Sequence, residues 1–351
     1  MSNVAANTET EEHVCANCGI AEVDDVKMEE CDGCDLVKYC SDKCREEHRQ
    51  QHDEECKKRE AELHNIDLFS QPEGSYHGNC PICFLPLSLN IRKSMMKPCC
   101  SKLICEGCAY AHYKINGDHN CPFCREPTID NLPNEDEIHR GMILKRIKAG
   151  DPVAMYQLGA MYRRDGEYDC AVEHLTKSAE LGNAAAHYLL GFMYREGAGI
   201  NRDAECENEA KNVENEYKKL LMDVIFSMHG YNPTGQFVEK DEEKAVYHLK
   251  KAAIGGHPEA RLALARDDME NGSIDRSVRH LIIAANLGHE ESMKMLWVQY
   301  SDGNITKEDL ESTLRTHKAA IDATKSTQRD EAAAAKFFVS EELGKEFSGR
   351  R

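Results

Sequence analysis

The sequence contains no long apolar run, and its first residues lack the apolar leader of a secreted protein. Nowhere in its 351 residues is there a stretch approaching the ~18 consecutive apolar residues that a membrane-spanning helix requires. The opening residues, MSNVAANTETEEHV, are polar and acidic, whereas a secretory signal has an apolar centre. We therefore expect a soluble protein of the cytoplasm, the nucleus or both, where cysteines stay reduced.

An excess of positive charge is also absent. Lys and Arg number 44 against 62 Asp and Glu, which gives a formal net charge of -18. Nucleic acids and anionic membranes are bound through concentrated Lys and Arg, so neither is an expected partner of the whole chain. The Lys and Arg between Arg45 and Arg59 alternate with Asp and Glu, which indicates a solvated helix face.

Cysteine is scarce in the last two thirds of the chain and dense before it. Only Cys170 and Cys206 lie beyond Cys124, and we expect them to be a small buried residue and an exposed surface residue. The other 15 of the 17 cysteines lie between Cys15 and Cys124, mostly in C-x2-C pairs. In a reducing compartment this pattern indicates Zn²⁺ sites, with metal rather than an apolar core holding the segments folded.

The first cysteine block, residues 15–56, has eight candidate ligands in the order C-x2-C, C-x2-C, C-x3-C and H-x3-C. Eight ligands suffice for two tetrahedral sites. The spacing, with Tyr39 directly before the fifth ligand, is similar to that of the MYND zinc finger. The resemblance implies two interleaved sites. One is formed by Cys15, Cys18, Cys40 and Cys44, and the other by Cys31, Cys34, His52 and Cys56.

A helix is expected from Ser41 through Cys56, because Ser41 can cap its start and the ligands then stack one turn apart. His48 does not have the ligand spacing and is expected to be an exposed polar residue. MYND fingers bind partner proteins, commonly through short proline-containing peptides. Arg45 and Arg49 stand here where many members have Gln and Trp, which favours an acidic or otherwise different partner.

The second cysteine block, residues 80–125, follows a charged linker that is expected to be helical and to end in the loop QPEGSYHGN. Its spacing resembles that of a RING finger. The resemblance implies that ligands one, two, five and six hold one Zn²⁺: Cys80, Cys83, Cys105 and Cys108. The other Zn²⁺ would be held by Cys121 and Cys124 together with Cys99 and Cys100.

The second site of this block has an open alternative. One of the two adjacent cysteines could instead be paired with His112, but adjacent thiolates at a tight turn are favoured. Thiolates are strong Zn²⁺ ligands, and His112 lies off-register on the helix expected after Cys108. His119 is expected to be a loop residue.

Three residues beside the ligands also match the RING pattern: Ile82, Pro122 and Arg125. In RING ubiquitin ligases these positions contact the ubiquitin-conjugating enzyme, and the arginine can bridge to ubiquitin. The alternative explanation is that Ile82 and Pro122 only pack locally and that Arg125 is an ordinary surface arginine. The usual Trp between ligands six and seven is absent, so only Tyr110 or Tyr113 offers an aromatic surface there. Such a domain needs no nucleophile, because it acts by orienting the thioester-linked ubiquitin.

The remaining chain repeats a helical pattern. The segments SAELG, AAIGG and AANLG end at Gly182, Gly256 and Gly288, and each is followed by a new helix, as a glycine C-cap predicts. With the A-x-x-x-LG-x-x-Y core, the pattern resembles Sel1-like repeats, relatives of the tetratricopeptide repeat. The resemblance implies a helical solenoid that binds protein. Apolar residues at helical spacing, Trp297 included, are assigned to its core, and no catalytic constellation is present.

The solenoid is expected to begin with a capping helix at 135–148, with Asn134 as its N-cap, and to end with a helix at 306–324. The overall fold class is mainly α, with two small cross-braced zinc-finger domains followed by an α-helical repeat solenoid. The expected boundaries are a disordered N-terminus at 1–13, a MYND-type finger at 14–57, a linker at 58–78, a RING-type finger at 79–128, repeats at 134–325 with a helical insertion at about 201–237, and a tail at 326–351.

Two functions fit this organisation. The first is a RING-type ubiquitin ligase with four structural Zn²⁺, which recruits a ubiquitin-conjugating enzyme through the RING and a protein substrate through the repeats and the MYND finger. The alternative is a non-catalytic scaffold that uses all three modules to bind proteins. A transcriptional or chromatin regulator is less favoured by the acidic charge, and no methyltransferase-like segment accompanies the finger.

Overall fold

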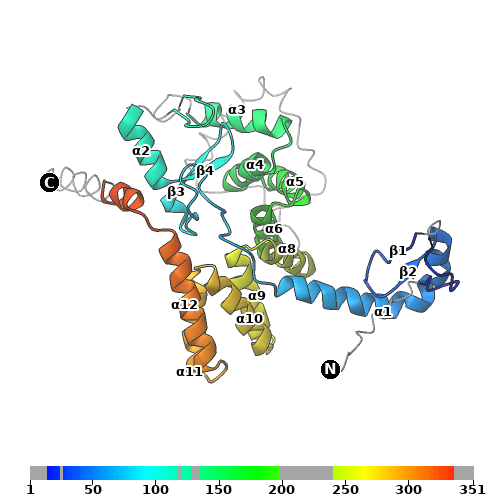
Figure 1. Cartoon of the computed structure of the whole chain (residues 1–351). Coiled ribbons are helices and arrows are strands. Elements are labelled where there is room, and N and C mark those ends of the chain that lie inside the picture. Colours follow the sequence, from blue (N-terminus) through cyan, green and yellow to red (C-terminus); the bar gives the residue numbers. More distant parts are fainter. Residues whose placement is uncertain (1–13, 24–26, 117–119, 128–134, 198–239, 336–351) are drawn as a thin grey trace, which may run out of the picture. The chain divides into compact units, whose positions relative to one another are not determined.

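The computed structural model describes residues 14–23, 27–116, 120–127, 135–197 and 240–335 (Figure 1). The chain is mainly α and divides into two compact units, Met1–Ser70 and Gln71–Arg351. Across the described ranges, every helix is too short or too polar to cross a membrane. The following expectations lie outside these ranges: the N-terminus at 1–13, the loop residue His119, Asn134 as an N-cap, the insertion at about 201–237, Cys206, and the tail beyond residue 335.

The first unit consists of a two-stranded antiparallel sheet and one long helix. Strand β1 (Glu29–Glu30) pairs with β2 (Lys38–Tyr39), and helix α1 (Asp42–Leu68) follows directly. Ser41 caps α1, as its sequence position predicts, by accepting a hydrogen bond of 3.4 Å from a first-turn backbone N–H. The helix expected in the finger and the helical linker expected after it are therefore one continuous helix of 27 residues.

The second cysteine block opens the second unit and is built on a hairpin. A 3₁₀ helix, η1 (Ile91–Lys93), leads into β3 (Ser94–Lys97), which pairs antiparallel with β4 (Lys102–Cys105). Helix α2 (Glu106–Asn116) continues from the end of β4. The block has a small apolar core in which the fully buried Leu87 and Ile104 pack among the cysteines. Such a core is too small to stabilise the block alone, which is consistent with metal-dependent folding.

The rest of the second unit is a stack of helices that pack against their neighbours in the chain (Figure 1). Helix α6 packs directly on α8, although residues 198–239 separate them in sequence. The last long helix ends as expected, with Thr306 and Thr324 as its caps. The helices are α3 (Glu135–Lys148), α4 (Pro152–Arg164), α5 (Tyr168–Glu180), α6 (Ala184–Glu196), α8 (Glu242–Ile254), α9 (Pro258–Glu270), α10 (Ile274–Asn286), α11 (Glu290–Ser301) and α12 (Lys307–Ala323).

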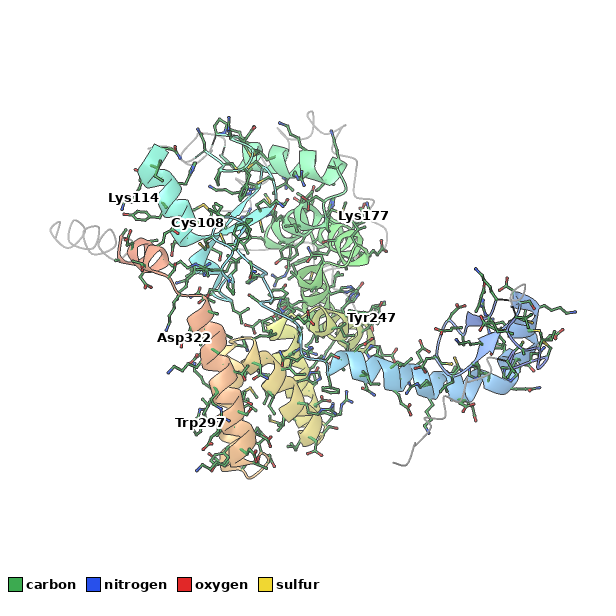
Figure 2. The ribbon with its side chains drawn as sticks, in the orientation of Figure 1. Cys108, Lys114, Lys177, Tyr247, Trp297 and Asp322 are labelled. Carbon is green, nitrogen blue, oxygen red and sulfur yellow. The ribbon has the colours of Figure 1, made fainter. Side chains whose placement is uncertain are left out.

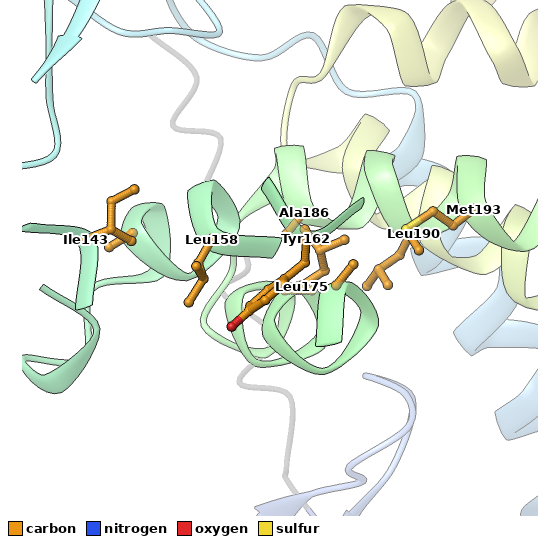
Figure 3. Close-up of a cluster of buried hydrophobic side chains, with 10 residues drawn as sticks. Ile143, Leu158, Tyr162, Leu175, Ala186, Leu190 and Met193 are labelled. Carbon is orange, nitrogen blue, oxygen red and sulfur yellow. The ribbon is translucent and has the colours of Figure 1, made fainter. Parts of the chain in front are cut away.

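The repeated Leu-Gly pair explains how these helices approach one another. A Cβ on Gly159 would lie 2.7 Å from Cγ of Leu175 on α5, and one on Gly191 would lie 2.9 Å from Cγ of Leu249 on α8. Only glycine permits this spacing, because real Cβ atoms do not approach so closely. Leu158 and Leu190, which precede the two glycines, are fully buried in the core between α3 and α6 (Figure 3).

One expectation about the repeats was wrong. Trp297 is 48% exposed rather than part of the core, because Leu296 occupies the buried face of α11 and the next residue points away from it. Its ring instead contacts Tyr300 edge-on, with 6.4 Å between centroids. The first part of the tail assigned to 326–351 is helical at 327–335 and buries Ala332.

Candidate metal centres

Within the described residues, the cysteines of the two blocks and His52 gather into four separate clusters. In each cluster the four donor atoms lie within 4.8 Å of one another. They are cluster 1 (Cys15, Cys18, Cys40, Cys44), cluster 2 (Cys31, Cys34, His52, Cys56), cluster 3 (Cys80, Cys83, Cys105, Cys108) and cluster 4 (Cys99, Cys100, Cys121, Cys124). In both blocks the clusters are interleaved along the chain, which is the arrangement that the resemblances to MYND and RING fingers imply.

Cluster 1 joins a backbone turn to the start of α1. Gly19, at φ 72°, lets the chain fold back so that its N–H donates to the carbonyl of Cys15 at 2.9 Å. Cys40 lies in the connection from β2 to α1, and its Sγ is 3.5 Å from that of Cys18. Cys44 lies in the first turn of α1, with its Sγ 3.7 Å from that of Cys40.

Cluster 2 is the only one of the four that contains a histidine. His52 and Cys56 lie one turn apart on α1, and His52 Nε2 is 3.1 Å from the Sγ of Cys34. The Sγ atoms of Cys31 and Cys56 are 3.6 Å apart. Gly33 is needed at the turn, because a Cβ there would lie 2.9 Å from the Sγ of Cys56.

His48 is not the exposed polar residue that was expected. It is half-buried, and its Nδ1 lies 3.1 Å from the hydroxyl of Tyr39. Its ring stacks on that of His52 with 5.7 Å between centroids. His48 therefore restricts the ring of a ligand, a supporting role that metal-bound histidines commonly require. The i, i+4 spacing of His48 and His52 on a helix was the sequence signal for this contact.

Arg45 and Arg49 differ in what they can offer a partner. The Arg45 guanidinium forms ion pairs with Glu29, Asp32 and Asp42 at 2.9 to 3.6 Å, all within the same block. Arg49 is exposed on α1. An acidic partner was expected because of Arg45 and Arg49, but only Arg49 is fully accessible to a partner.

Cluster 3 is the most deeply buried of the four. Cys80, Cys105 and Cys108 are each 3% exposed or less. The backbone N–H of Cys105 points to Cys80 Sγ, and that of Cys108 points to Cys105 Sγ, each at 3.4 Å. These donors stabilise negative charge on sulfur, as required of thiolate ligands.

Cluster 4 is formed at the tip of the hairpin. Cys99 and Cys100 both lie in the turn between β3 and β4, which Ser101 completes at φ 54°. The Sγ of Cys100 is 3.6 Å from that of Cys121. His112 lies apart from the cluster on α2, where its Nδ1 is 2.9 Å from the Asn116 amide. Of the two alternatives left open by the sequence, the structure assembles the all-cysteine set.

Two turns of the second block share one backbone conformation. In C-P-I-C-F (80–84) and C-P-F-C-R (121–125), the last residue has φ near 60° and donates its N–H to the first cysteine carbonyl at 2.8 to 2.9 Å. The third residues, Ile82 and Phe123, are 39% and 38% exposed, and Phe84 is 74% exposed. Phe84 and Phe123 were missed, although the parallel motifs indicated them. Pro122 is half-buried and Arg125 is exposed.

The donor chemistry of the clusters fits Zn²⁺. A tetrahedral site with Zn–S bonds of about 2.3 Å requires sulfur atoms about 3.8 Å apart, whereas a disulfide requires about 2.0 Å. The observed Sγ–Sγ separations are 3.5 to 3.8 Å, and all 15 cysteines of the two blocks are free. With four protein ligands at each cluster, no position is left for substrate, so the sites are structural rather than catalytic.

Electrostatics also favour a bound cation. Burial, and then hydrogen bonding to Cys105, raises the pKa of the Cys108 thiol. Burial, followed by hydrogen bonding to Cys124, raises the pKa of the Cys99 thiol in the same way. Four thiolates in such a small volume need a compensating positive charge, which Zn²⁺ supplies.

Comparison with solved structures finds Sel1-repeat proteins. A crystal structure of a Sel1 repeat protein from Oxalobacter formigenes is 21% identical, covers 54% of this chain and 80% of its own, and has a TM-score of 0.24. The structure of c5321, a protective antigen of uropathogenic Escherichia coli with an SLR fold, is 18% identical, covers 57% of this chain and 44% of its own, and has a TM-score of 0.23. No curated protein matches the chain.

Two family models match parts of the sequence. The MYND finger model matches residues 15–56, and the Sel1 repeat model matches residues 150–183, 184–205 and 234–257. The second cysteine block lies outside both matches. The interruption between 205 and 234 falls between α6 and α8, which pack on each other as the two helices of one repeat. The chain thus contains a zinc-binding MYND finger and Sel1 repeats, two kinds of protein-interaction module.

Proposed function

We propose that this protein is a RING-type ubiquitin ligase in which four structural Zn²⁺ ions hold two protein-binding fingers folded and a repeat array binds the substrate. The observation that carries the proposal is the pair of matching turns in the second cysteine block. Each turn presents an exposed apolar side chain, Ile82 or Phe123, from a cross-braced pair of clusters. Exposed apolar groups on a rigid, metal-held frame are suited to binding another protein.

The chain's own residues would act by binding and orienting. Ile82 and Pro122 would contact the ubiquitin-conjugating enzyme, and Tyr113, 44% exposed on α2, would replace the missing tryptophan. Arg125 is exposed and follows the last ligand, so its guanidinium would hold ubiquitin in an attack-ready position. The Zn²⁺ ions would fix this surface without touching substrate. Restraining the thioester is sufficient for catalysis, because orientation alone can remove several kcal/mol of barrier.

The alternative is a non-catalytic scaffold. It is favoured by the family matches, which fall on the MYND finger and the repeats, both protein-binding modules. In that case the exposed side chains of the second block would bind a protein other than a conjugating enzyme. The two functions differ in one measurable property, transfer of ubiquitin.

Autoubiquitination assays with a panel of conjugating enzymes distinguish the two. We expect transfer by the wild type with at least one enzyme, and a loss of about tenfold or more in Ile82→Ala, as for a central contact worth more than 1 kcal/mol. Arg125→Ala should reduce transfer while leaving enzyme binding intact. The matched control is Ile91→Ala, because Ile91 is 73% exposed on η1 of the same block. Absence of transfer with every enzyme, in protein that holds four Zn²⁺, would establish the scaffold instead.

A further inference from the structure

The helical segment that follows α12 returns to the second cysteine block and packs against cluster 3. We call residues 326–335 the C-terminal latch. Ser326 accepts a hydrogen bond from the backbone N–H of Arg329 at 3.3 Å, which caps the start of the latch helix. Lys114 of α2 forms an ion pair with Glu331 at 3.9 Å, and Ala332 is 2% exposed. Figure 2 labels Cys108 and Lys114 on α2, the helix that the latch contacts.

Arg329 is the central contact of the latch. One terminal nitrogen, Nη1, donates to the carbonyls of Pro86 at 2.7 Å and Thr324 at 2.6 Å. The other, Nη2, donates to the Leu85 carbonyl at 3.2 Å and lies 3.5 Å from the Sγ of Cys83. One guanidinium thus connects the end of α12 to the backbone that leaves the Cys80–Cys83 turn. Only arginine supplies enough donors in a fixed plane for these contacts.

The latch backbone also lies against the turn that carries the other two ligands. Gly107 stands between Cys105 and Cys108, and a Cβ on it would lie 2.9 Å from the backbone nitrogen of Arg329. Gln328 approaches the Sγ of Cys108 with its Oε1 at 3.9 Å. Both ligand-bearing turns of cluster 3 are therefore braced from one side by the latch.

The positive charge of Arg329 also compensates the negative charge of cluster 3. A Zn²⁺ ion bound by four thiolates carries a net charge of -2, which is costly in a cluster as buried as this one. Arg329 places a positive charge beside one of the sulfurs and is itself neutralised by that contact. Groups that hydrogen-bond metal ligands commonly change metal affinity by about 10–100-fold when removed.

We propose that Arg329 is a positioning residue of cluster 3 and that the C-terminal latch controls how firmly this cluster retains its Zn²⁺. The exposed Ile82 and Phe84 are not covered by the latch, so its role does not depend on ubiquitin transfer. The Zn²⁺ itself would supply only structural cross-linking. The cysteine block would then be completed by an arginine that lies 246 positions after Cys83 in the chain.

The test is site-resolved alkylation of the full-length protein in the presence of a chelator. Cysteine ligands react with a maleimide only after Zn²⁺ leaves, and mass spectrometry of the peptides reports each cluster separately. We expect Arg329→Ala to accelerate labelling of Cys83 and Cys108 by about 10–100-fold, with the peptides of clusters 1 and 2 unchanged. The matched control is Arg315→Ala, an exposed arginine of α12. Equal labelling rates in the two variants would overturn the proposal.

A second variant tests the latch without removing its arginine. Gly107→Ala introduces a Cβ that the latch backbone must avoid, although alanine is otherwise favourable in a helix. It should accelerate labelling of the same two cysteines. The double variant should release Zn²⁺ no faster than the quicker single variant, because both changes open one contact. Multiplying effects in the double variant would show two independent lesions and contradict a common latch.

Discussion

The two cysteine blocks use the same zinc chemistry on different supports. In the first, clusters 1 and 2 share α1, which contributes Cys44, His52 and Cys56 from a single 27-residue helix. In the second, clusters 3 and 4 are built on a short hairpin and two matching turns, and one of them is braced by Arg329 from the other end of the chain. Local helix geometry thus suffices for the first block, whereas the second depends on the repeat array that carries its latch.

The difference extends to how each block is joined to the chain. The loop that precedes the second block is held to that block by Ser75, whose hydroxyl donates to the Leu87 carbonyl at 2.8 Å. The same loop also contacts the array. The rings of Tyr76 and His257 are tilted relative to each other with 4.8 Å between centroids, and Gln71 accepts a hydrogen bond from Asn286 at 3.1 Å. Metal and packing therefore stabilise the second block together.

Removal of all Zn²⁺ should give the largest effect, and it compares the cysteine blocks with the repeats. A strong chelator should abolish the fold of the first block, since each structural Zn²⁺ contributes on the order of 10 kcal/mol. The repeats should remain helical, because they contain their own core around Leu158 and Leu190. Limited proteolysis followed by mass spectrometry, with the zinc content measured before chelation, checks this. We expect four Zn²⁺ per chain, and a content of two would mean that one block does not bind metal.

Single histidine substitutions in the first block compare a metal ligand, His52, with its neighbour His48. His52→Ala removes one ligand of cluster 2 and should release about one Zn²⁺ per chain, with opening of the C-terminal part of the block. His48→Ala should retain all four Zn²⁺ and cost only about 1 kcal/mol, because it removes a hydrogen bond and a ring contact. Zinc content and chelator-induced release rates distinguish them. Equal losses in the two variants would show that His48 is itself required for metal binding.

The sequence predicted most of the metal ligands but few of the contacts that hold those ligands in place. Local repeats such as C-x2-C indicate the candidate ligands, and the resemblances to MYND and RING fingers imply how they divide into sets. The structure gathers the same sixteen side chains in those sets. The sequence favoured Cys99 and Cys100 over His112 as ligands, because the position of His112 on its helix follows from nearby residues alone. The Gly and Leu of each repeat likewise predicted helix pairing.

What the sequence did not reveal depends on long-range contacts. Nothing near Arg329 indicates that its guanidinium reaches Leu85 and Pro86, because no periodicity connects positions so distant. Trp297 was misassigned because periodicity gives a helix a buried face but does not give the neighbour that covers it. His48 was misassigned because metal spacing was the only role considered for it.

Acid should weaken the array that supports the second block, and this is the smallest effect we expect. His187 on α6 and His248 on α8 share a contact of 2.9 Å between their Nδ1 atoms, so both cannot be protonated there. Burial, and then the charges of His187 and Lys244, lowers the pKa of His248 to about 4. The unfolded chain, with an ordinary histidine pKa near 6.5, therefore binds more protons between pH 6.5 and 4, and stability falls as the pH is lowered through this window.

Hydrogen exchange of the α6 and α8 peptides at pH 7 and pH 5, corrected for intrinsic rates, measures this effect. The wild type should lose on the order of 1 kcal/mol of protection after allowance for solvent screening of the half-buried pair. His248→Gln removes the titrating group and should show a smaller loss, with α1 peptides of the first unit responding equally in both proteins. An identical loss in wild type and variant would place the acid response elsewhere, and the zinc clusters, whose thiolates compete with protons for the metal, would then be its source.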